Sequence, residues 1–125
     1  MQAERRPGRK NPVLDQIDRY QPHLPLEEAS TCPALWYVDP RILELEQRTT
    51  FARTWQYACR ADQVREPGEF VTLELGGEPL AVVRGGDGLL RGFFNVCRHH
   101  AAAVLTEPAG CVKRLRCPYH GWPYT

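Results

Sequence analysis

Two short Cys/His pairs near the end of the chain constrain its fold more than any other feature. Cys97 and His99 form a Cys-x-His pair, and Cys117 and His120 form a Cys-x-x-His pair, with residues 100–116 between them. The first spacing places both side chains on one face of a short extended segment, and the second does so across a tight turn. Two such loops, folded tip to tip, would present two thiols and two imidazoles to one metal centre. The sequence therefore predicts a scaffold that holds these loops together.

Three kinds of site use such residues. One Cys and one His from each of two loops is the ligand set of a [2Fe-2S] cluster in which imidazoles replace two thiolates and raise the reduction potential. Structural zinc also binds two Cys and two His, but zinc motifs keep like ligands together in the sequence. A disulfide between Cys97 and Cys117 is the least favoured reading, because nothing else in the chain indicates an oxidising compartment. The mixed pairing favours the cluster.

Composition indicates one modest domain. The chain has 125 residues, a net charge of +1 and 42% hydrophobic residues, and its balanced charge argues against a nucleic-acid partner. It has no apolar run near the roughly 18 residues that a membrane span needs, and no apolar region follows its basic first residues. The odd number of cysteines, five, argues against a disulfide framework. We expect a cytoplasmic protein that binds neither nucleic acid nor membrane.

The first third of the chain is expected to be an arm followed by a helix. Prolines interrupt residues 1–30, where only a short helical face around Val13 and Ile17 is expected. We expect this arm to be poorly ordered alone. Asp39 and Pro40 match an N-cap followed by proline at the first helical position, which predicts a helix over 40–49.

The rest of the chain has the period of β-strands. Alternating or continuous apolar residues predict strands over 55–60, 70–75, 80–83 and 89–96, separated by glycine-containing turns. Residues 85–88 would form the tight turn of a hairpin whose second strand ends at Cys97. A rigid antiparallel scaffold of this kind is what protruding ligand loops need.

Residues 35–124 resemble the Rieske domain of the α subunit of Rieske non-haem iron oxygenases, the family of aromatic ring-hydroxylating dioxygenases and choline monooxygenase-like enzymes. The resemblance lies in Trp36-Tyr37-Val38-Asp39-Pro40, Phe51-Ala52-Arg53-Thr54-Trp55, Arg84 with Gly88, Asn95-Val96-Cys97-Arg98-His99-His100 and Cys117-Pro118-Tyr119-His120-Gly121-Trp122. It implies a mainly β fold over residues 31–125, a Rieske-type antiparallel β-sandwich with a two-loop cluster-binding subdomain, preceded by the arm and one short helix. By resemblance, Cys97, His99, Cys117 and His120 hold one [2Fe-2S] cluster, and Trp122 is suited to shielding it from water.

The resemblance also implies a role in an oxidoreductase. The cluster would receive electrons from a ferredoxin or an NAD(P)H-dependent reductase and pass them to a mononuclear Fe(II) held by two His and one carboxylate in a downstream domain. Only His23 and His100 remain as spare histidines, so no catalytic residue is expected within this chain. We expect the Rieske domain to be truncated before its closing strands, and the full-length subunit to be a homo-oligomer.

Two other interpretations stay open. The chain could be a stand-alone Rieske ferredoxin-like carrier, or a zinc-stabilised interaction module. Respiratory-chain Rieske proteins are disfavoured because they carry two further cysteines and a hydroxyl residue where this chain has Ala102, Tyr119 and Trp122. Without that hydroxyl donor to the cluster sulfurs, a potential in the lower part of the Rieske range, about −150 to +300 mV, is expected.

Overall fold

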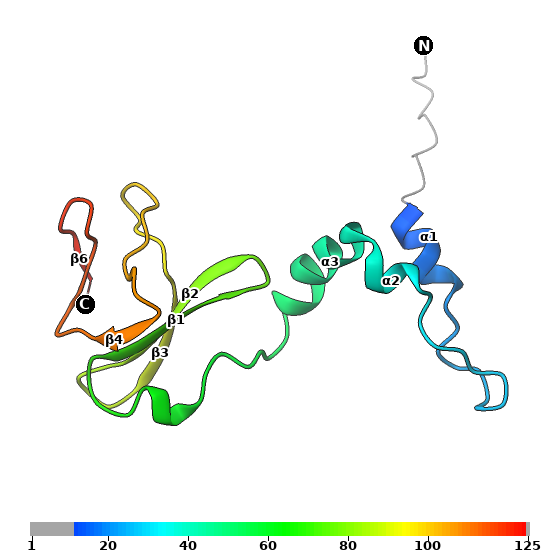
Figure 1. The fold of residues 1–125 in the computed structure, drawn as a ribbon, viewed down its shortest axis with the longest axis horizontal. Helices are drawn as coiled ribbons and strands as arrows, with labels where there is room; N and C mark the ends of the chain where they lie inside the picture. Colours follow the sequence, from blue (N-terminus) through cyan, green and yellow to red (C-terminus); the bar gives the residue numbers. More distant parts are fainter. Residues whose placement is uncertain (1–11, 125) are drawn as a thin grey trace, which may run out of the picture. The chain divides into compact units, whose positions relative to one another are not determined.

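A computed structural model describes residues 12–124 of the chain. The chain divides into two compact units, one ending at Glu46 and the other beginning at Gln47 (Figure 1). Most of the arm predicted over residues 1–30 can be followed from residue 12, whereas residues 1–11 lie outside the described part. Its poor order in isolation, and the domain boundaries at 30 and 31, stay predictions. Within residues 12–124, no helix combines the length and apolar character needed to cross a bilayer.

The first unit is helical. It contains α1 (Pro12–Arg19), α2 (Leu35–Val38) and α3 (Pro40–Glu46). Asp39 has an extended conformation, and its carboxylate accepts the amide N–H of Arg41 at 3.0 Å, which makes it the N-cap of α3. Hydrogen bonds from Arg41 also lower the pKa of Asp39 to about 2. The predicted helix start is confirmed, while the predicted end at residue 49 falls within a π-helical turn, η1 (Gln47–Phe51), that continues from α3.

The second unit is built on two antiparallel sheets (Figure 1). The strands are β1 (Glu69–Leu75), β2 (Glu78–Arg84), β3 (Leu90–Phe94), β4 (Ala109–Cys111), β5 (Leu115–Arg116) and β6 (Pro123–Tyr124). The larger sheet has the strand order β3-β2-β1-β4, and the smaller sheet pairs β5 with β6. A short 3-10 helix, η2 (Ala61–Gln63), precedes β1. These sheets confirm the predicted mainly β architecture.

Glycine and a small apolar core fix the larger sheet. Gly76 and Gly77, with φ of 61° and 84°, form the β1–β2 turn, because both positions need the left-handed conformation. Phe70, Ala81, Val83 and Leu105 form the buried core of this unit, with Val112 and Leu115 packed against them. The core thus lies between β1, β2 and the chain that links the two ligand loops.

The predicted strand over residues 55–60 is wrong. This segment is irregular and has no strand partner among residues 12–124. The side chains of Trp55 and Tyr57 within it are exposed. Alternation of apolar residues predicts an extended backbone with two faces, but a strand also needs a neighbouring edge with which to form hydrogen bonds. The alternation of residues alone does not show whether such a neighbouring edge is present.

Asn95 holds the first ligand loop against the sheet. Its side chain is 8% exposed, donates to the Leu105 carbonyl at 2.8 Å, and accepts the N–H groups of Val104 and Leu105 at 3.2 and 2.9 Å. Asn95 follows β3 directly and lies two residues before Cys97. The bonds therefore tie the two ends of residues 95–105, the segment that contains Cys97 and His99.

Replacing Asn95 by Ala should lower the free energy of unfolding of the cluster-free chain by about 2 kcal/mol, because it leaves buried backbone groups without partners. Urea denaturation followed by circular dichroism measures this difference. Thr106→Ala serves as the control, since Thr106 is an exposed polar residue beside the same loop. Equal denaturation midpoints for the Asn95 and Thr106 variants would contradict this role of Asn95.

Candidate metal centre

The two ligand loops have the same backbone hydrogen-bond pattern. In each, the cysteine N–H donates to the carbonyl five residues later, and the cysteine carbonyl accepts the N–H four residues later. The four bonds measure 2.8–2.9 Å and join Cys97 to Ala102, Ala101 to Cys97, Cys117 to Trp122 and Gly121 to Cys117. The fourth residue after each cysteine has positive φ, 58° at Ala101 and 72° at Gly121. Both loops therefore turn the same way, although their His spacings differ.

The two thiols lie at the start of these loops and are buried. Cys97 and Cys117 are each 2% exposed, and neither forms a disulfide. The Tyr124 hydroxyl donates to Cys97 Sγ at 2.9 Å and accepts the Arg98 N–H at 3.1 Å. The bond from Tyr124, followed by backbone N–H groups of the loop and the Cys117 thiol, lowers the pKa of Cys97 from 9.0 to about 7. Thiolate, the form that binds metals, is therefore favoured at Cys97.

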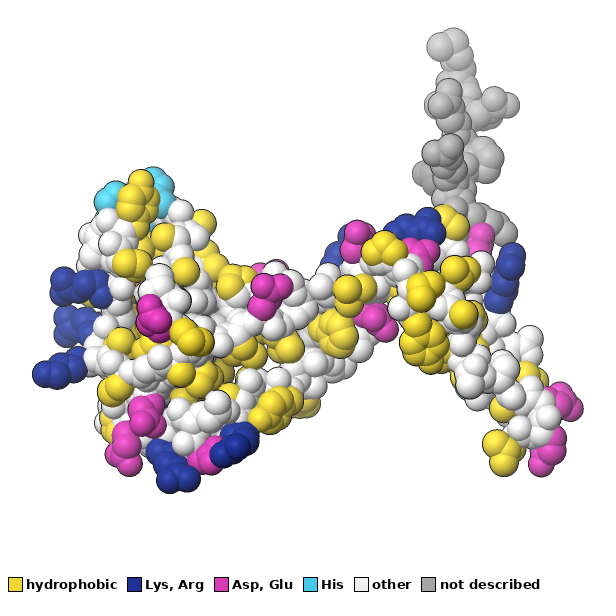
Figure 2. Space-filling model, in the orientation of Figure 1, with side chains coloured by type: hydrophobic (Ala, Val, Ile, Leu, Met, Phe, Trp, Pro, Cys, Tyr) yellow, Lys and Arg dark blue, Asp and Glu magenta, His cyan; other side chains and the backbone are white. Residues whose placement is uncertain are grey.

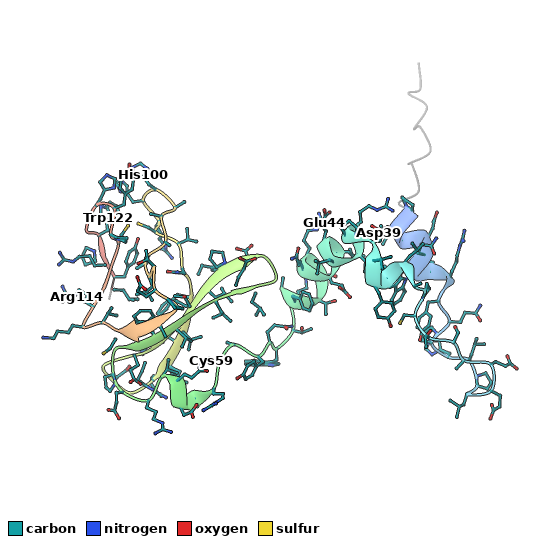
Figure 3. The ribbon with its side chains drawn as sticks, in the orientation of Figure 1. Asp39, Glu44, Cys59, His100, Arg114 and Trp122 are labelled. Carbon is teal, nitrogen blue, oxygen red and sulfur yellow. The ribbon has the colours of Figure 1, made fainter. Side chains whose placement is uncertain are left out.

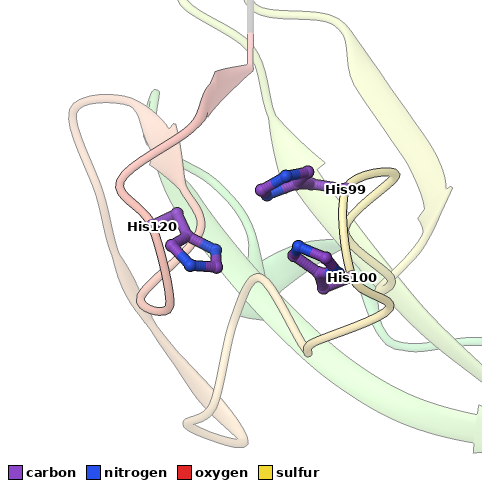
Figure 4. Close-up of side chains that lie close together, drawn as sticks. All are labelled: His99, His100 and His120. Carbon is purple, nitrogen blue, oxygen red and sulfur yellow. The ribbon is translucent and has the colours of Figure 1, made fainter.

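The imidazoles lie at the exposed tips of the loops. His99 and His100 come from the first loop and His120 from the second, and the rings face a common space (Figure 4). The Trp122 ring stacks on His99, with ring centroids 4.5 Å apart and planes at 6°. Figure 3 shows Trp122 and His100 at the same end of the unit, with Cys59 far from them. The stacking holds the ring plane of His99 while its edge stays accessible.

The donor atoms are arranged in an inner thiol pair and an outer imidazole group. Among residues 12–124, the one group of three or more His, Cys, Asp or Glu donors close enough together to hold a metal ion is His99, His100 and His120, whose donor atoms lie within 4.8 Å of one another. No such group includes a thiol. A single tetrahedral zinc would need thiols and imidazoles about 3.5 Å apart. Two buried thiols and separate surface imidazoles instead fit a two-iron cluster, which spaces its ligand pairs on different metals.

The structure agrees with some site expectations and adds two residues. Cys97 and Cys117 are buried against the scaffold, whereas His99 and His120 are exposed. Trp122 is 47% exposed and stacks on His99, so it does not pack in the core. Tyr124 was missed, although its place two residues after Trp122 in an extended segment puts both side chains on one face. His100, a spare histidine by its sequence, directly follows His99 and therefore reaches the same space as His99 and His120.

Comparisons with known proteins agree with this site. The Rieske [2Fe-2S] domain family matches residues 54–125. Choline monooxygenase of Spinacia oleracea is 37% identical over 112 residues, covering 90% of this chain and 25% of that protein. The glycine betaine monooxygenase oxygenase subunit of Chromohalobacter salexigens is 38% identical over 92 residues, which cover 74% of this chain and 21% of that protein. The chain thus spans about a quarter of the length of these relatives.

Solved structures show the same similarity. One similar structure is a quaternary ammonium Rieske monooxygenase for which carnitine oxidation and inter-subunit electron transfer are described. It has a TM-score of 0.72 and 32% identity to this chain, and the match covers 77% of this chain and 26% of that chain. Naphthalene 1,2-dioxygenase from Rhodococcus sp. has a TM-score of 0.71 and 32% identity, covering 76% of this chain and 22% of that one. The fold, the paired loops and the family match together show that this chain belongs to the Rieske [2Fe-2S] domain family, as found in Rieske oxygenases.

Proposed function

We propose that Cys97, His99, Cys117 and His120 hold a Rieske [2Fe-2S] cluster that serves as the electron-accepting centre of an oxygenase α subunit of the choline monooxygenase-like group. The observation that carries this proposal is the inner pair of buried thiols with separate, exposed imidazoles in two loops of matching backbone pattern. When bound, the cluster accepts and releases one electron.

The chain's own residues prepare this centre in three ways. Hydrogen bonds from Tyr124 and the loop backbone favour the thiolate of Cys97. Burial keeps water from both sulfurs. Stacking against Trp122 orients His99, while the exposed edges of His99 and His120 are left for a neighbouring redox partner.

These edges are the proposed exit for electrons toward the mononuclear iron of the oxygenase, in a neighbouring subunit of a homo-oligomer. The inter-subunit electron transfer described for the similar quaternary ammonium monooxygenase supports that route.

The chain segment that links the two ligand pairs carries a basic surface. It consists of Lys113, Arg114 and Arg116, all exposed, and no carboxylate among residues 12–124 forms an ion pair with them. Figure 2 shows dark blue side chains along one edge of the unit, below the histidines in this view, and Figure 3 labels Arg114 on that edge. Positive charge beside a redox centre speeds association with an acidic partner. We propose that the electron donor, a ferredoxin or an NAD(P)H-dependent reductase, approaches over this basic surface.

Replacing both Lys113 and Arg114 by Glu should slow reduction of the cluster by its donor at low ionic strength. The difference should shrink as salt shortens the Debye length to roughly 8 Å. Stopped-flow absorbance, with an acidic ferredoxin as donor, measures the rate across a salt series. Reduction by dithionite, which needs no protein docking surface, should proceed at comparable rates in both proteins.

Arg19→Glu combined with Arg53→Glu is the matched control, because it changes net charge equally at positions outside the basic surface. If both double variants slow reduction to the same extent, overall charge accounts for the effect. If neither does, with cluster content and potential unchanged, Lys113 and Arg114 are ordinary solvated charges and donor docking over the basic surface is wrong.

A further inference from the structure

The third histidine gives the loop tips a donor set that the cluster does not use. The ring centroid of His100 lies 3.9 Å from that of His99 and 5.3 Å from that of His120, and the centroids of His99 and His120 are 4.9 Å apart (Figure 4). One nitrogen from each ring can be chosen so that all three lie within 4.8 Å of one another. All three side chains are exposed, and none is paired with a carboxylate among residues 12–124.

This spacing is close to that of a mononuclear metal site. Two nitrogens bound to tetrahedral zinc are about 3.4 Å apart, so small rotations of the exposed His100 and His120 side chains toward the His99 ring would close the group. Three histidines with a water as fourth ligand is an established zinc coordination. The thiols of Cys97 and Cys117 do not belong to this group of donors.

We propose that the cluster-free chain binds one Zn²⁺ through His99, His100 and His120. The site shares His99 and His120 with the cluster ligands assigned above, so zinc and cluster exclude each other. This exclusion rests on the proposed function, whereas the zinc site itself does not. His100 belongs to the zinc site alone. Zinc bound at the loop tips would therefore block assembly of the cluster until it is removed.

Zinc affinity of the full 125-residue chain, purified without cluster, tests the site by competition with a chromophoric chelator. His100→Ala should weaken binding by at least about tenfold, or about 1.4 kcal/mol. His23→Ala, which removes the one histidine outside the loops, should leave the affinity unchanged. Circular dichroism confirms that each variant is folded. Equal affinities of the wild-type chain and the His100 variant, or no stoichiometric zinc binding, would overturn the proposal.

The type of ligand is identified from the absorption spectrum of the chain with Co²⁺ bound in place of zinc. The wild-type chain should show d–d bands without a thiolate-to-cobalt charge-transfer band, and Cys97→Ser should leave that spectrum unchanged. A strong charge-transfer band that disappears in Cys97→Ser would place the metal on a mixed Cys/His set and refute the three-histidine site.

Exclusion is tested separately. Zinc-loaded wild-type chain should fail to take up iron and sulfide, while the His100→Ala chain, exposed to the same zinc, should assemble a cluster with a normal EPR signal. If the zinc-loaded wild-type chain takes up a cluster and keeps its zinc, the two sites do not share His99 and His120. The proposed cluster ligand set would then be wrong, even if the zinc site is correct.

Discussion

Replacing Cys117 by Ser should abolish cluster binding. The serine hydroxyl does not ionise near neutral pH and is a poor iron ligand. The variant therefore lacks the inner pair of ligands that Cys97 and Cys117 form. After anaerobic reconstitution, iron and acid-labile sulfide should fall to background, and the visible absorbance of the cluster should disappear. Circular dichroism of the cluster-free variant shows whether the fold is kept.

The matched control is Cys59→Ser. Cys59 belongs to the same unit but lies far from Trp122 and His100 (Figure 3). This variant should bind iron and sulfide as the wild-type chain does. Full cluster content in the Cys117 variant, or equal loss in the two variants, would remove Cys117 from the ligand set.

Replacing Tyr124 by Phe should lower the reduction potential while the cluster is retained. The Tyr124 hydroxyl donates to Cys97 Sγ at 2.9 Å, and a hydrogen bond to a ligand sulfur stabilises the more negative, reduced cluster. A difference of about 1 kcal/mol between the two oxidation states corresponds to about 40 mV for a one-electron couple. Redox titration followed by EPR or visible absorbance measures the shift.

The same substitution changes the cluster-free chain. The bond from Tyr124 is the largest cause of the lowered pKa of Cys97, about 7 instead of 9.0. Its removal should raise that pKa, so that alkylation of Cys97, followed by peptide mass spectrometry, begins at higher pH. Tyr119→Phe is the control, because it removes an exposed hydroxyl of the second loop that forms no hydrogen bond to sulfur among residues 12–124. Equal potentials for the two variants would show that Tyr124 does not tune the cluster.

The sequence predicted what depends on local chemistry. The N-cap at Asp39, the β1–β2 turn at Gly76 and Gly77 and the hairpin that ends before Cys97 each follow from neighbouring residues, and the structure contains them. The paired spacing of cysteines and histidines likewise placed two facing loops at the end of the sheet.

Features that depend on distant partners were not predictable in this way. Residues 55–60 alternate like a strand but have no neighbouring edge among the described residues. Tyr124 reaches Cys97 only because β6 pairs with β5 and returns beside the first loop. The matching backbone turn of the two loops was also not predictable from the sequence. Ala101 occupies the position in the first loop that Gly121 occupies in the second, and Ala rarely adopts positive φ.

We expect this chain to bind a [2Fe-2S] cluster through two cysteines and two histidines. Iron, zinc and acid-labile sulfide analysis, combined with EPR of the reduced protein after anaerobic purification with iron and sulfide supplied, tests it most directly. The protein should contain about two irons and two sulfides per chain, with the low average g value typical of mixed Cys/His ligation. Stoichiometric zinc without acid-labile sulfide under these conditions, or an EPR signal of all-cysteine ligation, would contradict it.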